Sequence, residues 1–314
     1  MSEDFELTLW DRLEMIRAVL QTVPYENIYL SFSGGKDSTV LHHMLDEALP
    51  GNTIERVFSN TGIEFNDVVD FVKGMAAEDS RIKIITPKKN IKQMLEEVGY
   101  PFKSKFHSEM VERFQKSGGV HGKSLTRYLS NPGKPGRYNV PKKLVYQFTP
   151  EFNLKISQKC CSELKKKPIH AYEKETGKTL CITGVRANEG GIRQFQADKH
   201  GCIFRDSEGS IYKFNPLSPV SDEFMDWYIE KRGIKLARLY YEPFCFRRTG
   251  CKGCPYNIKL AQELDTMEQL LPNERKQCEL IWKPVYDEYR RIGYRNMKLT
   301  QERLFDDEAL KEKE

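Results

Sequence analysis

Residues 27–38, with the sequence NIYLSFSGGKDS, decide the fold class of this chain. A short apolar run, Asn27 to Phe32, leads into two glycines flanked by serines. The next stretch, Thr39 to Leu49, spaces its apolar residues as a helix does, and Pro50 and Gly51 end it. This order predicts a strand, a tight loop and a helix, the unit from which parallel sheets are built.

The alternation of strand and helix continues along the chain. Further strands are expected at 54–59, 82–86 and 180–184, and further helices at 6–22, 67–75 and 91–98. We therefore predict an α/β fold with a doubly wound, mostly parallel sheet. In such sheets ligands bind at the carboxyl ends of the strands, where the loops after 32, 59 and 184 lie.

A basic insertion interrupts the alternation at about 101–150, a stretch rich in Gly, Pro, Lys and aromatic residues and expected to be partly helical. Within it, residues 103–143 hold ten Lys or Arg against two Asp or Glu, a net charge of +8 in a chain of net charge +5. We predict an N-terminal helix over 1–24, a nucleotide-binding domain over 25–257, and a charged, mostly helical tail over 258–314.

Composition indicates a globular protein of a reducing compartment. The 314 residues are 39% hydrophobic, enough for a sizeable core, and no window has the ~18 consecutive apolar residues of a membrane span. The start, MSEDFELTLW, is acidic, unlike a secretory signal. We expect a cytoplasmic protein with no membrane partner, in which the eight cysteines are not a disulfide framework and the clustered ones indicate metal binding.

The loop from Ser33 to Ser38 has the features of a phosphate site. The start of a helix presents backbone N–H groups to an anion, and Gly34 and Gly35 let the backbone approach closely. Lys36 adds a mobile positive charge, and Asp37 can orient the loop or hold magnesium through water. The GxxxxGK spacing of a Walker loop is absent.

This loop resembles the SGGxDS signature of the PP-loop family, the nucleotide alpha hydrolases. The resemblance implies an adenine nucleotide alpha hydrolase-like fold and an enzyme that splits ATP, with Mg2+, into AMP and pyrophosphate. The nucleotide-binding residues we expect are Ser33, Gly34, Gly35, Lys36, Asp37, Ser38, Asn60, Thr61, Gly62 and Gly184.

Two cysteine clusters indicate a metal centre. Cys160 and Cys161 are adjacent, and Cys245, Cys251 and Cys254 follow about 90 residues later. A CxxC turn completed by a distant pair is the usual construction of a zinc or an iron–sulfur site. Adjacent cysteines point in different directions, which favours a [4Fe-4S] cluster over a single zinc ion.

Over roughly residues 25–257 the chain resembles the iron–sulfur adenylylsulfate and phosphoadenylylsulfate (PAPS) reductases. The shared features are the CC pair with its basic run, the later CxxC, and a GxRxxE segment from Gly184 to Glu189 with Arg193. The resemblance implies that Arg186 and Arg193 contact phosphate or sulfate and act in catalysis with Lys36 and Asp37. The implied cluster ligands are Cys160, Cys161, Cys251 and Cys254, with Cys245 a candidate replacement ligand or sulfur carrier.

The reaction is left with three alternatives. Thiol-dependent reductases use a cysteine in a C-terminal ECG-like motif, whereas the last cysteine here, Cys278, lies in a predicted helix. We therefore expect an ATP-using, adenylyl-forming enzyme of sulfur chemistry, with a sulfur donor protein and a nucleic-acid acceptor bound through residues 103–143. The alternatives are a sulfonucleotide reductase that uses a thiol reductant and makes sulfite, and a non-enzymatic nucleotide or redox sensor.

Overall fold

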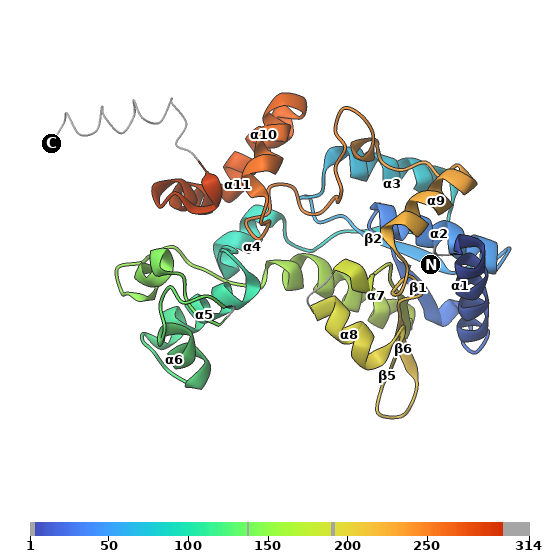
Figure 1. Cartoon of the computed structure of the whole chain (residues 1–314), viewed down its shortest axis with the longest axis horizontal. Helices are drawn as coiled ribbons and strands as arrows, with labels where there is room; N and C mark the ends of the chain where they lie inside the picture. The colour runs from blue at the N-terminus through green and yellow to red at the C-terminus, as the bar shows by residue number, and fades with distance from the viewer. Residues whose placement is uncertain (1–3, 137, 190–191, 298–314) are drawn as a thin grey trace. The chain divides into compact units, whose positions relative to one another are not determined.

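The computed structural model of the chain describes residues 4–136, 138–189 and 192–297 (Figure 1). The chain forms two compact units, each made of two stretches of sequence. We call residues 1–88 with 165–250 the sheet unit, and residues 89–164 with 251–314 the helical unit.

The sheet unit contains a six-stranded sheet in the order β3-β2-β1-β4-β6-β5. All neighbours are parallel except β5, which runs antiparallel to β6. Chain order reverses between β1 and β4, the kind of place where such sheets bind ligands. The predicted α/β fold class is confirmed. The strands are β1 (Ile28–Ser31), β2 (Glu55–Ser59), β3 (Ile82–Ile85), β4 (Leu180–Ile182), β5 (Ile203–Arg205) and β6 (Ile211–Phe214).

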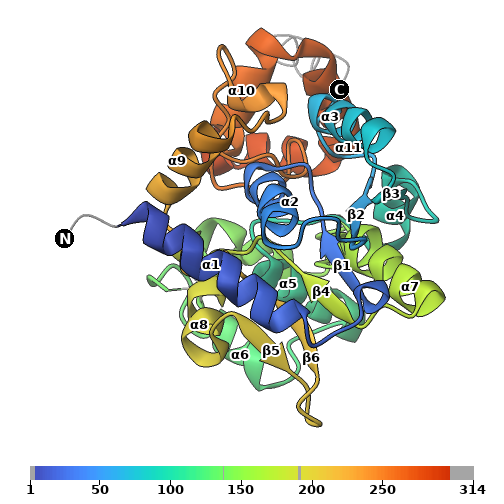
Figure 2. The same cartoon turned by 90° about the vertical axis from the view of Figure 1, so that its right-hand side faces the viewer.

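Helices cover both faces of this sheet. Figure 1 shows α1, α2, α3 and α9 on one face and α7 and α8 on the other, and Figure 2 shows α1 beside α2. Their apolar faces and the strands share one core, in which Ile16, Leu30 and Leu45 are fully buried. The helices are α1 (Phe5–Leu20), α2 (Lys36–Ala48), α3 (Asn66–Glu78), α7 (Lys167–Thr176), α8 (Ile192–His200) and α9 (Asp222–Arg232), with short turns η1 (Tyr25–Asn27), η3 (Ser162–Lys166), η4 (Ala187–Glu189) and η5 (Arg238–Tyr240).

The helical unit is built around aromatic residues. His107 is fully buried between Tyr128 Oη, 2.9 Å from its Nδ1, and Gln147 Oε1, 2.6 Å from its Nε2. Trp282 is also fully buried. The elements are α4 (Ile91–Val98), α5 (Lys105–Ser117), α6 (Lys123–Leu129), η2 (Lys142–Phe148), α10 (Leu260–Leu270), α11 (Pro272–Arg291) and η6 (Tyr294–Asn296).

The predicted helices and strands of the first 98 residues are all present, with ends shifted by a few residues. The sequence prediction missed the β5–β6 hairpin, whose turn is closed by Asp206: its Oδ1 accepts from the N–H groups of Glu208 and Ser210, each at 2.9 Å. The predicted domain boundaries at 24 and 257 stay predictions. Among the described helices, none is long and apolar enough to cross a membrane.

A buried ion network fixes the end of α2 to β2 and β3. The fully buried Arg56 donates from Nη2 to Asp46 Oδ1 at 2.7 Å, and Arg81 donates to both oxygens of Asp46 at 2.8 and 2.9 Å. Burial alone would raise the pKa of Asp46, but the hydrogen bonds from Arg81 and the charge of Arg56 outweigh it and lower the pKa to about 2. The ionised carboxylate therefore stabilises the folded state.

We predict that Asp46→Asn lowers the free energy of unfolding at pH 7 by about 2 kcal/mol, because Arg56 stays buried without its counter-charge while the Asp46 position is partly screened by solvent. Because the pKa of Asp46 is lower in the folded state than in the unfolded state, this stabilisation is present above about pH 4 and is lost as pH falls from about 4 to about 2. The difference in free energy of unfolding between wild type and variant must therefore shrink over that range. Urea unfolding measures both. The control is Asp265→Asn, which changes an exposed residue of α10. Equal midpoints of urea unfolding for the two variants would contradict the role of the network.

Candidate functional site

The phosphate loop between β1 and α2 leaves no room for side chains at its glycines. Gly34 has φ +67°, and a Cβ there would lie 2.6 Å from Val72 Cγ2 and 3.0 Å from Val68 Cγ1 on α3. A Cβ on Gly184, after β4, would lie 3.0 Å from the carbonyl oxygen of Asp37. The loops after β1 and β4 are therefore in backbone contact at the switch point of the sheet.

Both loop serines make hydrogen bonds inside the loop. Ser38 Oγ accepts from the N–H of Ser33 at 3.2 Å and donates to the carbonyl of Gly35 at 3.0 Å. Ser33 Oγ accepts from the N–H of Gly35 at 3.3 Å. In this state the two hydroxyls hold the loop in shape.

A tyrosine that sequence reasoning missed sits on this loop. Tyr240 Oη accepts from the N–H of Lys36 at 2.9 Å and lies 2.8 Å from Thr249 Oγ1. A Cβ on Gly35 would lie 3.2 Å from the same Oη. Tyr240 belongs to no motif, so no signal in the sequence could have identified it.

Charged groups converge beside the loop. Lys36 Nζ lies 3.1 Å from Asp226 Oδ1. Arg186, 4% exposed, donates from Nη2 to Asp222 Oδ1 at 2.6 Å, and its Nε lies 3.3 Å from Asp37 Oδ1. Within the described ranges, Arg186 Nη1 is buried with no hydrogen-bond partner, and the buried Asp37 Oδ1 has only its ion pair with Arg186 Nε. A buried donor is costly to leave unpaired, so a ligand that accepts from Arg186 Nη1 is favoured.

Two further arginines belong to this cluster. Burial lowers the pKa of Arg193, and the positive charges of Arg248 and Arg186 lower it further, against the opposing charge of Asp37. The hydrogen bond from Arg186, with the charges of Arg186, Lys36 and Arg248, lowers the pKa of Asp222. Sequence reasoning missed Arg248, although the pair Arg247-Arg248 just before the CxxC was a visible signal. Lys36, Arg186 and Arg248 are thus within electrostatic range of Asp222, and Arg193 is within range of Asp37, Arg186 and Arg248.

A cavity of about 110 Å3 adjoins the loop within the sheet unit. Its wall includes Ser33 of the loop, Ser59 and Glu64 near the end of β2, and Thr249. The side chains of the turn Asn60-Thr61-Gly62 make local hydrogen bonds. Asn60 Oδ1 accepts from the N–H of Gly62 at 3.1 Å, and Thr61 Oγ1 donates to the carboxylate of Glu64. The nucleotide-binding role of that turn stays a prediction.

The four predicted ligand cysteines all lie in the helical unit. A hydrogen bond to Cys161 raises the pKa of the buried Cys160 thiol, as do burial and the charges of Cys161, Cys251 and Cys254. Burial, and then the charges of Cys251 and Cys161, raises the pKa of Cys254 to about 12. The two segments thus bring their thiols within electrostatic range of one another. Among the described residues, no three His, Cys, Asp or Glu side chains are grouped as around a single metal ion.

Helix α11 holds the CxxC turn. Trp282 Nε1 donates to the carbonyl of Lys252 at 3.2 Å, Tyr289 Oη donates to that of Pro255 at 3.0 Å, and Tyr286 Oη donates to that of Gly253. Gly253 has φ +61°, and a Cβ there would lie 2.8 Å from Cys278 Sγ. The C-terminal segment is therefore a scaffold for the cysteines, and the buried Cys278 is part of that packing.

Cys245 belongs to the sheet unit, whereas Cys251, six residues later, belongs to the helical unit. It is exposed and has φ +48°. A hydrogen bond with Glu242 raises the pKa of its thiol. Its roles as replacement ligand or sulfur carrier stay predictions.

The aromatic residues of the basic segment 103–143 and its flank are mostly structural. Phe102 and Tyr128 are fully buried and Phe114 is 9% exposed, whereas Tyr138 is 47% exposed and lies under Arg127 at 5.3 Å. The interleaved pattern therefore reflects a core more than a base-stacking surface. Arg137 of this segment is outside the described residues.

Comparison with known proteins gives a family. The family model described as the phosphoadenosine phosphosulfate reductase domain matches residues 27–257, more than half of the chain. A curated protein of uncharacterised function from Methanocaldococcus jannaschii is 38% identical over 76 residues, which are 24% of this chain. The matched stretch spans only 18% of that relative's length.

Solved structures with a similar fold include three enzymes. A PAPS reductase from Candida auris in a phosphate complex is 19% identical, with 80% of this chain and 95% of that chain covered and a TM-score of 0.45. An NH3-dependent NAD synthetase from Campylobacter jejuni is 12% identical (90% and 95% covered, TM-score 0.39). A U34-tRNA thiolase from Methanococcus maripaludis with its [4Fe-4S] cluster is 15% identical (91% and 80% covered, TM-score 0.38).

The loop geometry predicts that Gly34→Ala destabilises the protein more than Gly51→Ala does. Both glycines have positive φ, which costs another residue about 1 kcal/mol, but Gly51 has open space around it whereas Gly34 faces Val72. We expect the added clash to cost about 2 kcal/mol more in thermal or urea unfolding. Equal losses of stability in the two variants would contradict the close packing of Gly34 against Val72.

Proposed function

The chain belongs to the phosphoadenosine phosphosulfate reductase domain family, and we propose that it is an enzyme that binds ATP at the Ser33–Ser38 loop and splits it into AMP and pyrophosphate. The observation that carries this proposal is the convergence of Lys36, Arg186, Arg193 and Arg248 on an intact SGGKDS loop. Arg186 Nη1 and Asp37 Oδ1, both buried and without a hydrogen-bond partner among the described residues, are the atoms that a bound polyphosphate and its Mg2+ would engage.

The proposed roles follow from charge. The N–H groups at the start of α2 and Lys36 hold the pyrophosphate as negative charge develops on it. Arg186 and Arg193 grip the remaining phosphate or a second anion, since guanidinium groups suit bidentate contacts with oxyanions. Asp37 Oδ1 orients the loop or contacts Mg2+ through a water, because Mg2+ usually keeps several waters.

The bond changes are those of an adenylyl transfer. An oxygen of the acceptor attacks the α-phosphorus, the bond between that phosphorus and the bridging oxygen breaks, and pyrophosphate leaves. A sulfur nucleophile, hydrosulfide or the persulfide of a donor protein, then attacks the activated carbon and AMP leaves with the acceptor's oxygen. We propose a nucleic acid as acceptor, attracted by the net charge of +8 on residues 103–143.

We further propose that Cys160, Cys161, Cys251 and Cys254 hold a [4Fe-4S] cluster. The donor set supports this, because all four atoms are thiol sulfurs from two segments within electrostatic range. Bound there, a cluster would supply electron transfer or an iron site for sulfur. Such thiols fit a reducing compartment, so we place the protein in the cytoplasm.

Sulfonucleotide reduction is the second candidate function. It is favoured by the exposed Cys245 thiol and by four positively charged side chains that would suit a ligand with phosphate and sulfate groups. These side chains are Lys36, Arg186, Arg193 and Arg248. A nucleotide sensor without turnover is the third candidate.

One experiment separates the three. Anaerobically purified protein is incubated with ATP and Mg2+, and separately with adenylylsulfate or PAPS and a thiol reductant, and the products are resolved by chromatography. AMP and pyrophosphate from ATP support the adenylating function. Sulfite from a sulfonucleotide shows a reductase instead, and nucleotide binding without any product shows a sensor.

Lys36→Ala should reduce ATP turnover at least ~100-fold, as loss of a preorganised transition-state contact does, with unchanged fold and iron content. The control is Lys73→Ala, which removes an exposed lysine of α3 and should leave turnover unchanged. Turnover of Lys36→Ala at the wild-type rate would refute the assigned role of the loop.

Cys254→Ser should bleach the brown absorbance near ~400 nm of anaerobically purified protein and lower its iron and sulfide content. Cys202→Ser in the sheet unit should keep both, since Cys202 is no predicted ligand. A colourless wild-type protein with one zinc ion per chain would overturn the cluster.

A further inference from the structure

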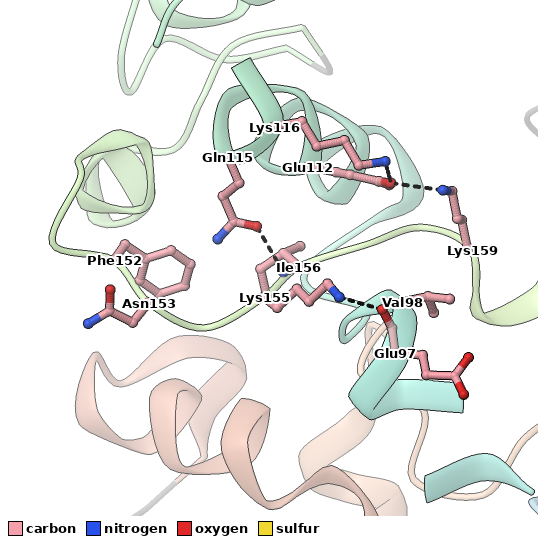
Figure 3. A pocket seen from close by; sticks show the side chains of 10 residues that line it. All are labelled: Glu97, Val98, Glu112, Gln115, Lys116, Phe152, Asn153, Lys155, Ile156 and Lys159. Carbon is pink, nitrogen blue, oxygen red and sulfur yellow. Dashed lines mark hydrogen bonds and ion pairs between the residues drawn. The ribbon is translucent and has the colours of Figure 1, made fainter. Parts of the chain in front are cut away.

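The helical unit contains a second and larger cavity, of about 480 Å3, which is lined by none of the predicted nucleotide-binding, catalytic or cysteine residues. Three lining residues, Glu112, Gln115 and Lys116, belong to the predicted nucleic-acid-binding segment 103–143. The cavity lies between the end of α4, the helix α5 and the segment 152–159 (Figure 3). Its volume is in the range of small-molecule sites.

Hydrogen bonds to the backbone fix the walls of this cavity. Gln115 Nε2 donates to the carbonyl of Leu154 at 2.8 Å, and its Oε1 accepts from the N–H of Ile156 at 3.1 Å (Figure 3). On the other side the N–H of Tyr100 donates to the carbonyl of Lys155 at 2.8 Å. Segment 152–159 is therefore held to α5 and to the chain after α4, so the cavity is preformed.

Lysines outnumber carboxylates at the cavity. Lys116 Nζ and Lys159 Nζ lie 2.6 and 3.3 Å from the same oxygen, Oε1, of the nearly buried Glu112, and Ser157 Oγ donates to Oε2 at 3.0 Å. Burial alone would raise the pKa of Glu112, but these hydrogen bonds outweigh it and lower the pKa. Glu112 is thus ionised at neutral pH, and one carboxylate faces two ammonium groups.

The third lysine has no carboxylate partner at the cavity. Lys155 Nζ donates to the backbone carbonyl of Glu97, while the carboxylate of Glu97 pairs with Lys89. Together with Lys116, Lys159 and Glu112, this leaves a net charge of about +2 at the rim. The cavity therefore favours an anionic ligand.

An aromatic ring and an amide complete the lining. Phe152 is partly exposed, and Tyr146 holds it edge to face at 5.5 Å between ring centroids. Asn153, beside it, is exposed and able to donate and accept hydrogen bonds at the edge of a planar ligand. A ring for stacking, an amide and lysines for phosphate are the groups with which proteins bind single-stranded nucleic acid.

We infer that this cavity binds one unpaired nucleotide of a nucleic-acid strand, with its base on Phe152 and its phosphates near Lys116 and Lys155. The inference rests on the proposed function in that the strand would be the acceptor. Lys159 precedes Cys160 directly, so the cavity wall and the cysteine cluster share one segment of the helical unit.

The charge around the cavity favours a strand over a free nucleotide. Residues 89–164 carry fourteen Lys or Arg against six Asp or Glu, a net charge of +8 that one mononucleotide does not need. A polyanion that crosses this surface would release counterions at several phosphates.

The test uses the full chain and measures binding of fluorescein-labelled 12-nucleotide single strands, RNA and DNA, by anisotropy at several salt concentrations without ATP. Phe152→Leu keeps an apolar side chain and should weaken binding ~10-fold through lost stacking. Lys155→Ala should weaken it and reduce the salt slope by about 0.7, the value for one phosphate contact on a single strand. Phe152→Trp should bind as wild type does.

The control is Lys276→Ala, which removes one exposed charge of the same unit outside the cavity. It should change affinity less than 2-fold, because an exposed charge without a direct contact to the strand contributes little. Equal affinities of wild type, Phe152→Leu and Lys155→Ala would overturn the inference. Equal losses for Lys155→Ala and Lys276→Ala would also overturn it, since binding would then follow net charge alone. Uridine or adenosine monophosphate binding as tightly as the 12-mers would show a free nucleotide as the ligand and overturn the strand.

Failure of this inference and failure of the proposed function are distinguishable. Lys36→Ala should bind the strands as wild type does, because its change lies in the sheet unit. Strand binding that depends on Phe152, in a protein that makes no AMP from ATP, keeps the cavity and removes the adenylating function. AMP formation in a protein whose strand binding does not depend on Phe152 supports the adenylating function and overturns the cavity as the strand-binding site.

Discussion

The structure depends on the close packing of two glycines, Gly34 and Gly184, at the switch point of the sheet. Gly34 lies against Val68 and Val72 of α3, and Gly184 lies against the first turn of α2. The loop after β4 can approach the backbone of Asp37 this closely only because Gly184 carries no Cβ. Arg186, two residues after Gly184, lies with its Nε 3.3 Å from Asp37 Oδ1.

The cysteine site shows the same reliance on a tight turn, but its support comes from far along the chain. The CxxC turn requires Gly253 at positive φ, and three backbone carbonyls between Lys252 and Pro255 accept from Trp282, Tyr286 and Tyr289 of α11. A buried carbonyl needs such a partner. The aromatic face of α11 thus fixes the backbone of the CxxC turn.

The sequence was sufficient for the parts whose signal is local. The strand, loop and helix around Ser33–Ser38 and the cysteine pairs are readable because their chemistry requires fixed spacings. Tyr240 was not predicted, because it acts on a loop more than 200 residues earlier and no local pattern marks it. Arg248 was not predicted because the pair Arg247-Arg248 does not by itself show that Arg248 lies near Asp222 and Arg193. The aromatic residues of the basic segment show the same limit, because a short run of sequence does not distinguish an exposed ring from a core ring such as Tyr128.

The four cations of the loop explain why this region would favour a polyanion over a neutral ligand. Burial and the positive charges of Arg248 and Arg186 lower the pKa of Arg193, and the carboxylate of Asp37 offsets this only in part. Under the proposed function, a polyphosphate with Mg2+ would offset these positive charges and would pair with Arg186 Nη1 and Asp37 Oδ1. Because Ser33 and Ser38 already bond within the loop, affinity for the anion would then come from charge and backbone N–H groups more than from hydroxyls.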